Sequence, residues 1–349
     1  TLNIGEAYLA LGQDSLASDF LTTAYVKLDQ LYGPKHARVF TAAYSLADYY
    51  AERDVKLALD YYGRAADFVD YHFLNVLPLL PTAERLSSME RYKKFIDKYF
   101  SFGYQHHGEN PTVGSKMYNT ALAYQHAREA LDIPTTVALT KEPTADLRKS
   151  YNQWKALRSQ IITATEKTVA ERTEMNVDLN ELLTDIQAIE KTMFHAYLNN
   201  HVGRESDGFI SSLKARLQSG DVLVNFFPLH WFNMQSQHFN DQEAYLTFVL
   251  GPTSTKIDLI EISLTQNVLD VEQSRGQSAY SQQIWSPLED VLSSHQRLLI
   301  VPTKRMNLVA FGALATKDGS LVWDEYKIDR LSSPFALINR TANASIQDK

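Results

Sequence analysis

The chain has 349 residues, a hydrophobic fraction of 44%, a charged fraction of 21% and a formal net charge of −7. These values are typical of a soluble globular protein, and the length predicts two or more domains. The negative charge and the lack of a clustered Lys/Arg stripe argue against direct nucleic-acid binding. The sequence contains no Cys, which excludes disulfides, thiolate metal sites and a Cys nucleophile within these residues.

Neither end of the chain predicts a membrane association. No apolar run approaches about 18 residues, and Thr1–Glu6 has no basic start and no long apolar core. We therefore predict a cytoplasmic protein with no membrane partner. Because the sequence starts with Thr and opens inside a helical pattern, we expect it to be a piece of a longer protein.

Residues 4–70 contain an internal repeat of small and large apolar residues. The second half of each copy superposes with a shift of 41 residues, which pairs these positions: Ala17 with Ala58, Leu21 with Tyr62, and Ala24 with Ala65. Small residues allow two helices to approach closely, and the large residues fill the space beside them. Such a helical hairpin cannot bury its apolar face alone, so the pattern predicts stacked hairpins.

This pattern resembles the tetratricopeptide repeat. The small-residue and aromatic positions follow in the right order, and Leu31–His36 resembles the linker of the longer repeats found in kinesin light chains. The resemblance implies an α-solenoid whose concave surface binds a partner. Two copies do not assign individual contact residues.

Two further helices are predicted after the prolines that interrupt the repeat. The first runs from Ala83 to about Tyr104, with Thr82 as its N-cap, and the second runs from Pro111 through Ala130. Between them lies the sequence His106-His107-Gly108-Glu109. A metal site is a weak interpretation of it, because adjacent histidines cannot share one helix face and no third ligand is near.

Residues 147–199 predict either one long helical region or a hairpin. Their apolar residues keep a helical spacing, and charges are scattered over the opposite faces. We favour a helix pair that braces the repeats, and a coiled-coil dimer is the alternative.

The pattern changes to strands after Gly203. Residues 222–227 and 244–250 predict strands, and the alternating residues 256–262 predict a strand near an edge. The connection from Leu229 to Gln242 carries three residues that could line a pocket, although a hairpin covering the sheet is the favoured interpretation: His230, Trp231 and His238. Residues 268–271 and 284–292 predict helices.

Residues 298–323 contain the strongest strand signal. Leu298–Val301 is a run of branched apolar residues that ends at Pro302, which is typical of a strand buried on both faces. A second apolar segment, Phe311–Leu314, follows, and Asp318-Gly319 marks a turn.

Residues 209–337 resemble the first part of a CHAT domain, the caspase-like peptidase module that often follows tetratricopeptide repeats in bacteria. The resemblance is carried by five segments: Gly220–Phe226, Ala244–Leu250, Trp285–Leu288, Leu298–Leu314 and Tyr326–Pro334. It implies the following organisation: a tetratricopeptide-like domain at 1–132, a long helical linker or brace at 133–203, and the N-terminal part of a CHAT domain at 204–349. The predicted fold class is thus an α-solenoid with long helices followed by a partial caspase-like α/β sheet.

The resemblance also implies where the catalytic residues of the family would lie. A His, generally followed by Gly, and then a Cys would come downstream of Ile338, and the chain contains neither. His295 precedes the core strand and is not a candidate. We therefore assign no catalytic residue, no binding residue, no metal site and no cofactor, and we expect this chain alone to lack peptidase activity.

Two functions remain open. In the first, the chain is the regulatory and scaffold portion of a caspase-like cysteine protease. Its repeats bind a protein or ribonucleoprotein partner that controls cleavage, as in CRISPR-associated and gasdermin-linked bacterial defence proteases, and the rest of the CHAT domain is its second partner. In the second, it is a non-catalytic interaction scaffold with a degenerate CHAT domain. A nucleotide-binding enzyme has little support, because no glycine-rich phosphate loop is present.

Overall fold

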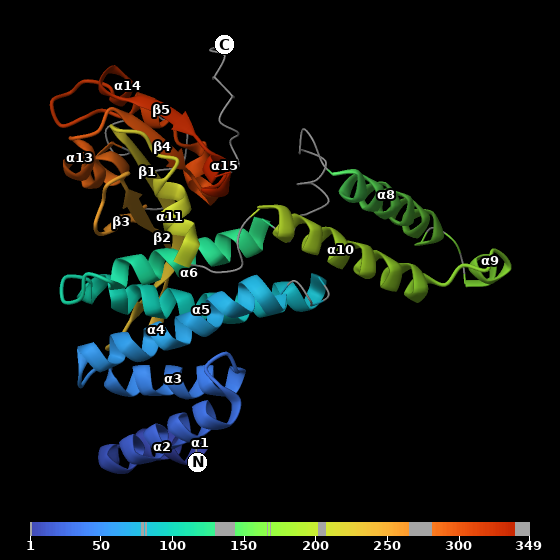
Figure 1. Ribbon diagram of the computed structural model, residues 1–349, viewed down its shortest axis with the longest axis horizontal. Helices are drawn as coiled ribbons and strands as arrows, with labels where there is room; N and C mark the ends of the chain where they lie inside the picture. The colour runs from blue at the N-terminus through green and yellow to red at the C-terminus, as the bar shows by residue number, and fades with distance from the viewer. Residues whose placement is uncertain are drawn as a thin grey trace. The chain divides into compact units, whose positions relative to one another are not determined.

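A computed structural model describes residues 2–77, 80, 82–129, 144–165, 167, 169–201, 207–264 and 281–338 (Figure 1). They form a mixed α/β protein in which helices come first and a five-stranded sheet lies in the C-terminal part. The described residues belong to two compact units: one is drawn from 1–69, 94–122 and 207–349, and the other from 70–93 and 123–206. These units do not follow chain order, and the predicted three-part division stays a prediction.

Four consecutive helices open the first unit: α1 (Leu2–Ala10), α2 (Asp14–Tyr32), α3 (Ala37–Tyr50) and α4 (Val55–Tyr71). Short turns join them, as predicted for helical hairpins. The paired positions of the repeat are all buried: Ala17, Leu21 and Ala24 in α2, and Ala58, Tyr62 and Ala65 in α4. The shift of 41 residues therefore marks equivalent buried positions in α2 and α4.

Helices α5 (Thr82–His106) and α6 (Val113–Glu129) follow the repeat, close to the predicted bounds. They approach closely at Gly103, where an added Cβ would lie 2.6 Å from Met117 Sδ. The aromatic stripe of α5 is core, as expected, because Tyr99, Phe100 and Phe102 are at most 1% exposed. Their burial fixes the second half of α5 in the first unit.

The second compact unit holds an antiparallel pair of helices. The π-helical turn η1 (His72–Val76) follows α4, and the pair consists of α8 (Ala145–Thr165) and α10 (Leu179–His201), with the short helix α9 (Val169–Glu174) between them. Residues 147–199 thus contain a hairpin and not one continuous helix. Trp154 Nε1 donates to Glu190 Oε1 at 3.1 Å across the pair.

The sheet has the order β3-β2-β1-β4-β5. Strand β1 (Asp221–Asn233) pairs antiparallel with β2 (His238–Leu250), which pairs antiparallel with β3 (Asp258–Ser263). On its other side β1 pairs in parallel with β4 (Arg297–Val301), which pairs in parallel with β5 (Lys327–Arg330). The predictions of β3 as an edge strand and of β4 as a buried strand are confirmed.

One face of the sheet packs against the segments that surround β4 in sequence. Its core contains Val224 and Ile300 from the strands, and Trp285 and Leu288 from the π-helical turn η5 (Ser281–Trp285) and helix α13 (Ser286–Leu292). Trp285 is fully buried. This confirms the predicted helix at 284–292, whereas the helix predicted at 268–271 lies outside the described residues.

The opposite face packs against α5 and α6. The Phe100 ring lies 5.2 Å from that of Phe227 and 5.9 Å from that of Phe248. Tyr118 of α6 stacks on Phe248 at 4.8 Å. These contacts belong to one compact unit, so the sheet and the second half of α5 share a core. Two short helices also pack together, because the Phe209 ring of α11 (Asp207–Lys214) lies 5.2 Å from that of Phe335 of α15 (Phe335–Ile338).

The connection from Leu229 to Gln242 is not an irregular loop. Both strands continue through it, and only residues 234–237 form the turn. The favoured hairpin interpretation is thus correct in type, but the segment extends the strands and does not fold back over the sheet. The predicted strand ends at Phe227, yet β1 continues through Pro228, which lies opposite Tyr245.

The C-terminal segment links β4 to β5 through short helices. These are η6 (Lys304–Leu308), η7 (Phe311–Ala313) and α14 (Val322–Glu325). Arg297 at the start of β4 forms an ion pair with Asp329 of β5, and its Nη1 lies 3.7 Å from Asp221 Oδ2 of β1. This arginine, the first residue of β4, therefore links the first residue of β1 to the third residue of β5. No helix in the described part of the chain is long and apolar enough to cross a membrane.

Candidate partner-binding cleft

A cleft of about 550 Å³ opens among the first three helices. We refer to it as the N-terminal cleft. It is lined from α1, α2 and α3 by the following residues: Leu2, Asn3, Ala24, Lys27, Leu28, Leu31, Arg38 and Thr41. It lies within residues 1–130, where the sequence predicts partner binding.

The floor of the N-terminal cleft is apolar. Leu2 and Leu28 are half-buried, and Leu31 is 71% exposed. A leucine this exposed beside half-buried ones offers apolar area that a partner's side chain can cover.

The charged groups of the cleft are all positive. Lys27 and Arg38 line it, and no lining residue is a carboxylate. Arg38 Nη1 donates to the Tyr32 hydroxyl at 3.3 Å, and its guanidinium lies 5.6 Å from the centre of the Tyr32 ring. Arg38 is thereby positioned without having its charge neutralised. In a chain of net charge −7, this local positive charge suits a segment that carries both apolar and acidic side chains.

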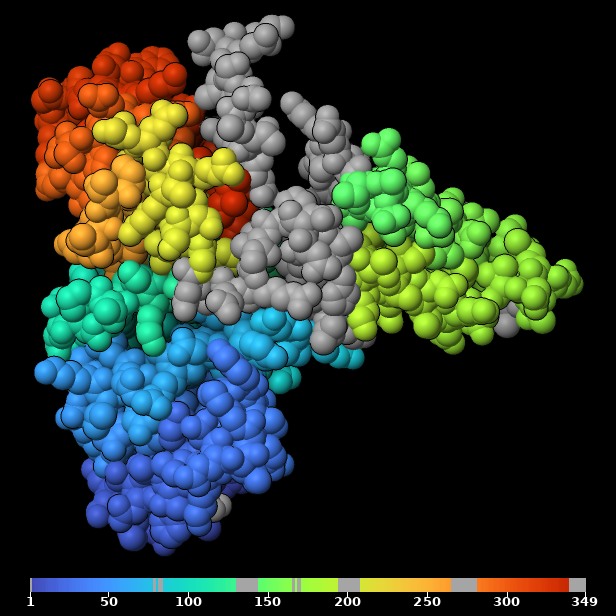
Figure 2. All heavy atoms as spheres, in the orientation of Figure 1, coloured from blue at the N-terminus to red at the C-terminus, as the bar shows by residue number. Residues whose placement is uncertain are grey.

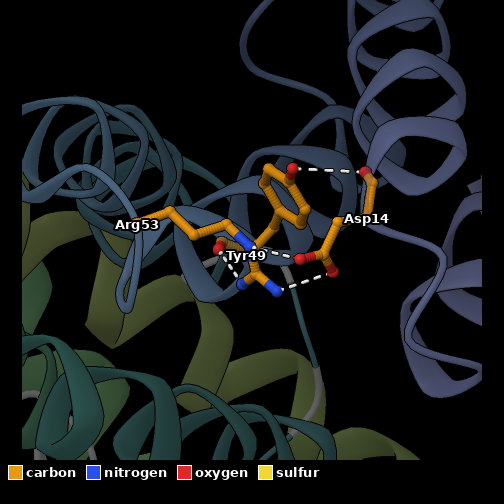
Figure 3. A network of polar contacts seen from close by, with 3 residues as sticks. All are labelled: Asp14, Tyr49 and Arg53. Atoms are coloured by element: carbon orange, nitrogen blue, oxygen red, sulfur yellow. Dashed lines mark hydrogen bonds and ion pairs between the residues drawn. The ribbon is translucent and has the colours of Figure 1, made fainter.

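A three-residue clamp fixes α2 against α3 (Figure 3). Arg53 donates from Nη2 to Asp14 Oδ1 at 2.7 Å and from Nε to Oδ2 at 3.3 Å. Its Nη1 donates to the carbonyl oxygen of Tyr49 at 2.7 Å, and the Tyr49 hydroxyl donates to the carbonyl oxygen of Asp14 at 3.2 Å. The clamp joins the start of α2 to the end of α3, whereas the cleft is lined by the opposite ends of these two helices.

A buried charge joins the helices to the sheet. Lys98 of α5 is 6% exposed, and its Nζ lies 2.8 Å from Asp48 Oδ2 of α3. Asp48 Oδ1 accepts a hydrogen bond from the Tyr62 hydroxyl of α4 at 2.7 Å. On the other side, Lys98 Nζ lies 4.5 Å from the centre of the Phe232 ring of β1 and 5.5 Å from that of Tyr44. One ammonium thus contacts α3 and β1 together, with α4 attached through Asp48.

The surroundings of this ion pair shift the pKa values of Asp48 and of its hydrogen-bond partner Tyr62. Burial raises the pKa of the Asp48 carboxyl, and the Lys98 ammonium and the Tyr62 hydroxyl oppose that rise. Burial and the neighbouring Asp48 raise the pKa of Tyr62 well above its usual value. Tyr62 therefore remains a hydrogen-bond donor, and Lys98 supplies the counter-charge that the buried carboxyl needs.

The far end of the β1–β2 hairpin is fastened to α5 by a second set of contacts. The backbone N–H of Phe232 donates to Ser101 Oγ at 2.8 Å, and Ser101 Oγ donates to the carbonyl oxygen of Asp97 at 2.7 Å. The Trp231 ring lies 5.4 Å from the Tyr104 ring. Phe232 is therefore packed in the core against α5, whereas residues 235–242 at the end of the hairpin are exposed.

The His106 segment forms a local pair. His106 Nδ1 lies 3.0 Å from Glu109 Oε1, and the His107 ring stacks on Tyr104 at 5.5 Å. Within the described parts of the chain, no group of three His, Cys, Asp or Glu side chains is placed to hold a metal ion.

The residues of the predicted 229–242 connection do not converge on a pocket. His230 Nδ1 faces the carbonyl oxygen of Asn240 across the hairpin at 3.2 Å, and His238 contacts Ser236 in the turn. Only Trp231 reaches α5. Of these three residues, one packs against α5 and the other two make contacts within their own hairpin.

The sequence excludes His295 as a catalytic residue, because it precedes the core strand. It is half-buried in the turn before β4, where its Nδ1 lies 3.3 Å from Ser294 Oγ. On its other side the ring lies near Gly251, where an added Cβ would be 3.5 Å from Nε2.

Comparison of the chain with protein-family models, with curated proteins and with solved structures finds no match. The tetratricopeptide and CHAT resemblances therefore stay predictions from sequence motifs.

Sequence reasoning missed both the N-terminal cleft and the buried Lys98. The signal for Lys98 was present, because it lies inside the aromatic stripe of α5, between Phe95 and Tyr99. A lysine on a buried face needs an acidic partner or an aromatic face. The cleft gave no comparable signal, since it depends on how three helices pack.

Proposed function

We propose that this chain is the partner-binding, regulatory portion of a caspase-like cysteine protease of the tetratricopeptide–CHAT type. The first helices bind a protein, or the protein part of a ribonucleoprotein, through a segment with acidic and apolar side chains. In this proposal the setting is cytoplasmic bacterial defence of the CRISPR- or gasdermin-linked kind, and the rest of the CHAT domain carries the peptidase chemistry.

One observation carries the regulatory part of the proposal. The helices that line the N-terminal cleft are tied through Asp48 and Lys98 to Phe232 of β1. A partner that shifts α3 would displace this ion pair, and β1 is central in the sheet. Binding at the helices would therefore be felt in the sheet domain without a mobile linker between them.

The order of the strands supports the proposal that the catalytic His and Cys lie downstream of Ile338. Strands β1, β4 and β5 are parallel, and β5 is an edge strand among the described residues. A further parallel strand could pair with β5 and place its C-terminal end beside that of β5. In a His–Cys peptidase such strand ends would hold the imidazole and the thiolate, and residues 339–349 contain neither a His nor a Cys.

Binding to the cleft is tested with a fluorescent synthetic peptide that carries alternating Glu and Leu side chains. Fluorescence anisotropy should show binding to the native chain and a loss of at least about tenfold in affinity for Lys27→Glu/Arg38→Glu, because two attractions become repulsions. The matched control Lys56→Glu/Lys94→Glu makes the same charge change at exposed sites outside the cleft and should bind like the native chain. Equal weakening by both variants would reject the cleft as the site.

The protease half of the proposal has its own test. The coding sequence after Lys349 should contain His-Gly and then a Cys at the end of an apolar strand. The longer protein should react with a Cys-directed active-site probe, whereas the 349-residue chain should not. A stop codon directly after Lys349 would reject the protease and leave the peptide result intact.

The second candidate is a non-catalytic interaction scaffold with a degenerate CHAT domain. It shares the cleft and its peptide ligand with the first. It differs in one expected result, because the protein encoded beyond Lys349 would then carry no probe-reactive Cys.

A further inference from the structure

The paired helices α8 and α10 of the second unit leave a groove between them. It has a volume of about 660 Å³ and is closed at one end by the residues that follow α9. The space-filling view draws the two helices beside each other along their length (Figure 2). We refer to this groove as the arm groove.

The arm groove is an unfinished apolar seam. Leu157 of α8 and Leu182 of α10 line it and are only half-buried, and Met175 at its closed end is 54% exposed. Ala164 is the one lining residue that the structure records as buried. Two helices alone cannot enclose such a seam, and a third helix is the usual way to complete it.

The dimensions of the groove fit a short length of helix. Its lining residues span 156–164 on α8 and 181–185 on α10, and Asp178 lines it just before α10 begins. At 1.5 Å per residue these spans are about 12 and 6 Å long, or about two helical turns and one turn. A helix laid in such a groove makes contact through positions i, i+3 or i+4, and i+7.

The charge on one rim of the groove indicates which charged side chains a bound helix would carry. Glu181 and Asp185 line the α10 side, and neither has an ion-pair partner among the described residues. The one lining cation, Arg172, donates from Nη1 to the carbonyl oxygens of Lys167 at 2.7 Å and Ala164 at 3.3 Å. The α8 rim is neutral, with polar residues such as Gln160. The groove is therefore apolar at its floor and negative along one side.

We propose that the arm groove binds an amphipathic basic helix of a partner protein, with Leu-type side chains on the floor and Lys or Arg side chains against Glu181 and Asp185. This site is separate from the N-terminal cleft, lies in the other compact unit and selects the opposite charge. It does not depend on the protease proposal.

The test uses the full 349-residue chain and a fluorescent synthetic peptide of about 18 residues, long enough to form a helix on binding. The peptide carries Leu at helical spacing and Lys along one flank. Two control peptides are a scrambled form of the same composition and a form with Glu in place of Lys. Fluorescence anisotropy should show binding of the basic amphipathic peptide and at least tenfold weaker binding of both controls.

Variants place the site. Glu181→Lys/Asp185→Lys should weaken binding at least tenfold. Met175→Ser should weaken it severalfold, because it removes apolar surface from the groove. Asp146→Lys/Asp241→Lys makes the same change in net charge outside the groove and should bind like the native chain. Circular dichroism of each variant separates loss of binding from loss of folding, and an unfolded double variant is replaced by Glu181→Gln/Asp185→Gln.

Three results would overturn the proposal. The first is equal binding by the groove variant and its matched control. The second is no preference for the basic amphipathic peptide over its scrambled form. The third is self-association of the chain in sedimentation experiments that is lost with Met175→Ser, because then a second copy covers the groove.

Discussion

At the scale of single residues, the described chain contains groups whose burial changes their chemistry. His72 is the clearest case. Burial, together with the smaller effect of the neighbouring Arg91, lowers the pKa of His72 to about 4. Its Nε2 lies 2.7 Å from Ser88 Oγ, and its ring lies 4.9 Å from that of Tyr92. The imidazole is thus neutral in the folded protein at neutral pH.

This shift predicts an acid-dependent loss of stability. An unfolded His has a pKa of about 6.5, so between pH 6.5 and 4 the unfolded chain binds a proton that the folded chain does not. Stability should fall as the pH drops through this window, by about 2 kcal/mol between pH 7 and pH 5.

Hydrogen exchange of residues 72–93 at the two pH values measures the effect. His72→Gln should remove most of this pH dependence, whereas His107→Gln, at an exposed histidine, should keep it. The same pH dependence in native protein and in His72→Gln would show that His72 is not responsible.

At the scale of elements, the length of the β1–β2 hairpin beyond the predicted strands 222–227 and 244–250 is what the sequence did not predict. The strands were predicted from their apolar runs, and the helices from their spacing and small residues. The hairpin extension was not, because Asn240, Asp241 and Gln242 have low strand propensity and are exposed. Packing of Phe232 and Trp231 on α5 decides the structure there, and contacts so distant in sequence leave no local signal. The N-terminal cleft and the arm groove were missed for the same reason.

Lys98 should be the most sensitive point of contact between these elements. Lys98→Ala removes the counter-charge of Asp48 in a buried setting, and it should lower the free energy of unfolding by about 3–5 kcal/mol. Lys98→Met/Asp48→Asn leaves no unpaired charge and should cost clearly less. Lys94→Ala, an exposed lysine on the same helix, should stay within about 0.5 kcal/mol of the native protein. Urea unfolding measures all three, and equal losses for Lys98→Ala and the double variant would contradict the ion-pair argument.

At the scale of the whole molecule, helices and sheet share one core in the first compact unit. Phe100 is fully buried between α5 and strands β1 and β2. The resemblance implies a repeat region at 1–132 that is separated by a brace at 133–203 from a CHAT region at 204–349. The packing instead predicts that helices α3 and α4 and the sheet unfold together.

Phe100→Ala tests this cooperativity. Loss of the ring should cost about 3–5 kcal/mol, because it leaves a cavity between α5 and the sheet. Hydrogen exchange should then speed up by similar factors in residues 37–71 and in residues 221–250. Leu308→Ala, at a residue that is 75% exposed, should leave both regions unchanged. Faster exchange in the sheet alone would show that the helices are a separate folding unit.

The hydrogen bond between Phe232 and Ser101 spans 131 residues of sequence. When synthesis of the chain proceeds from the N-terminus, α3, α4 and α5 are complete long before β1 exists. Until then Lys98, Ser101 and Tyr104 of α5 lack their contacts with the hairpin. Contacts this distant in sequence make folding slow. The helical part of the first unit therefore reaches its final core only after the ribosome has made the hairpin.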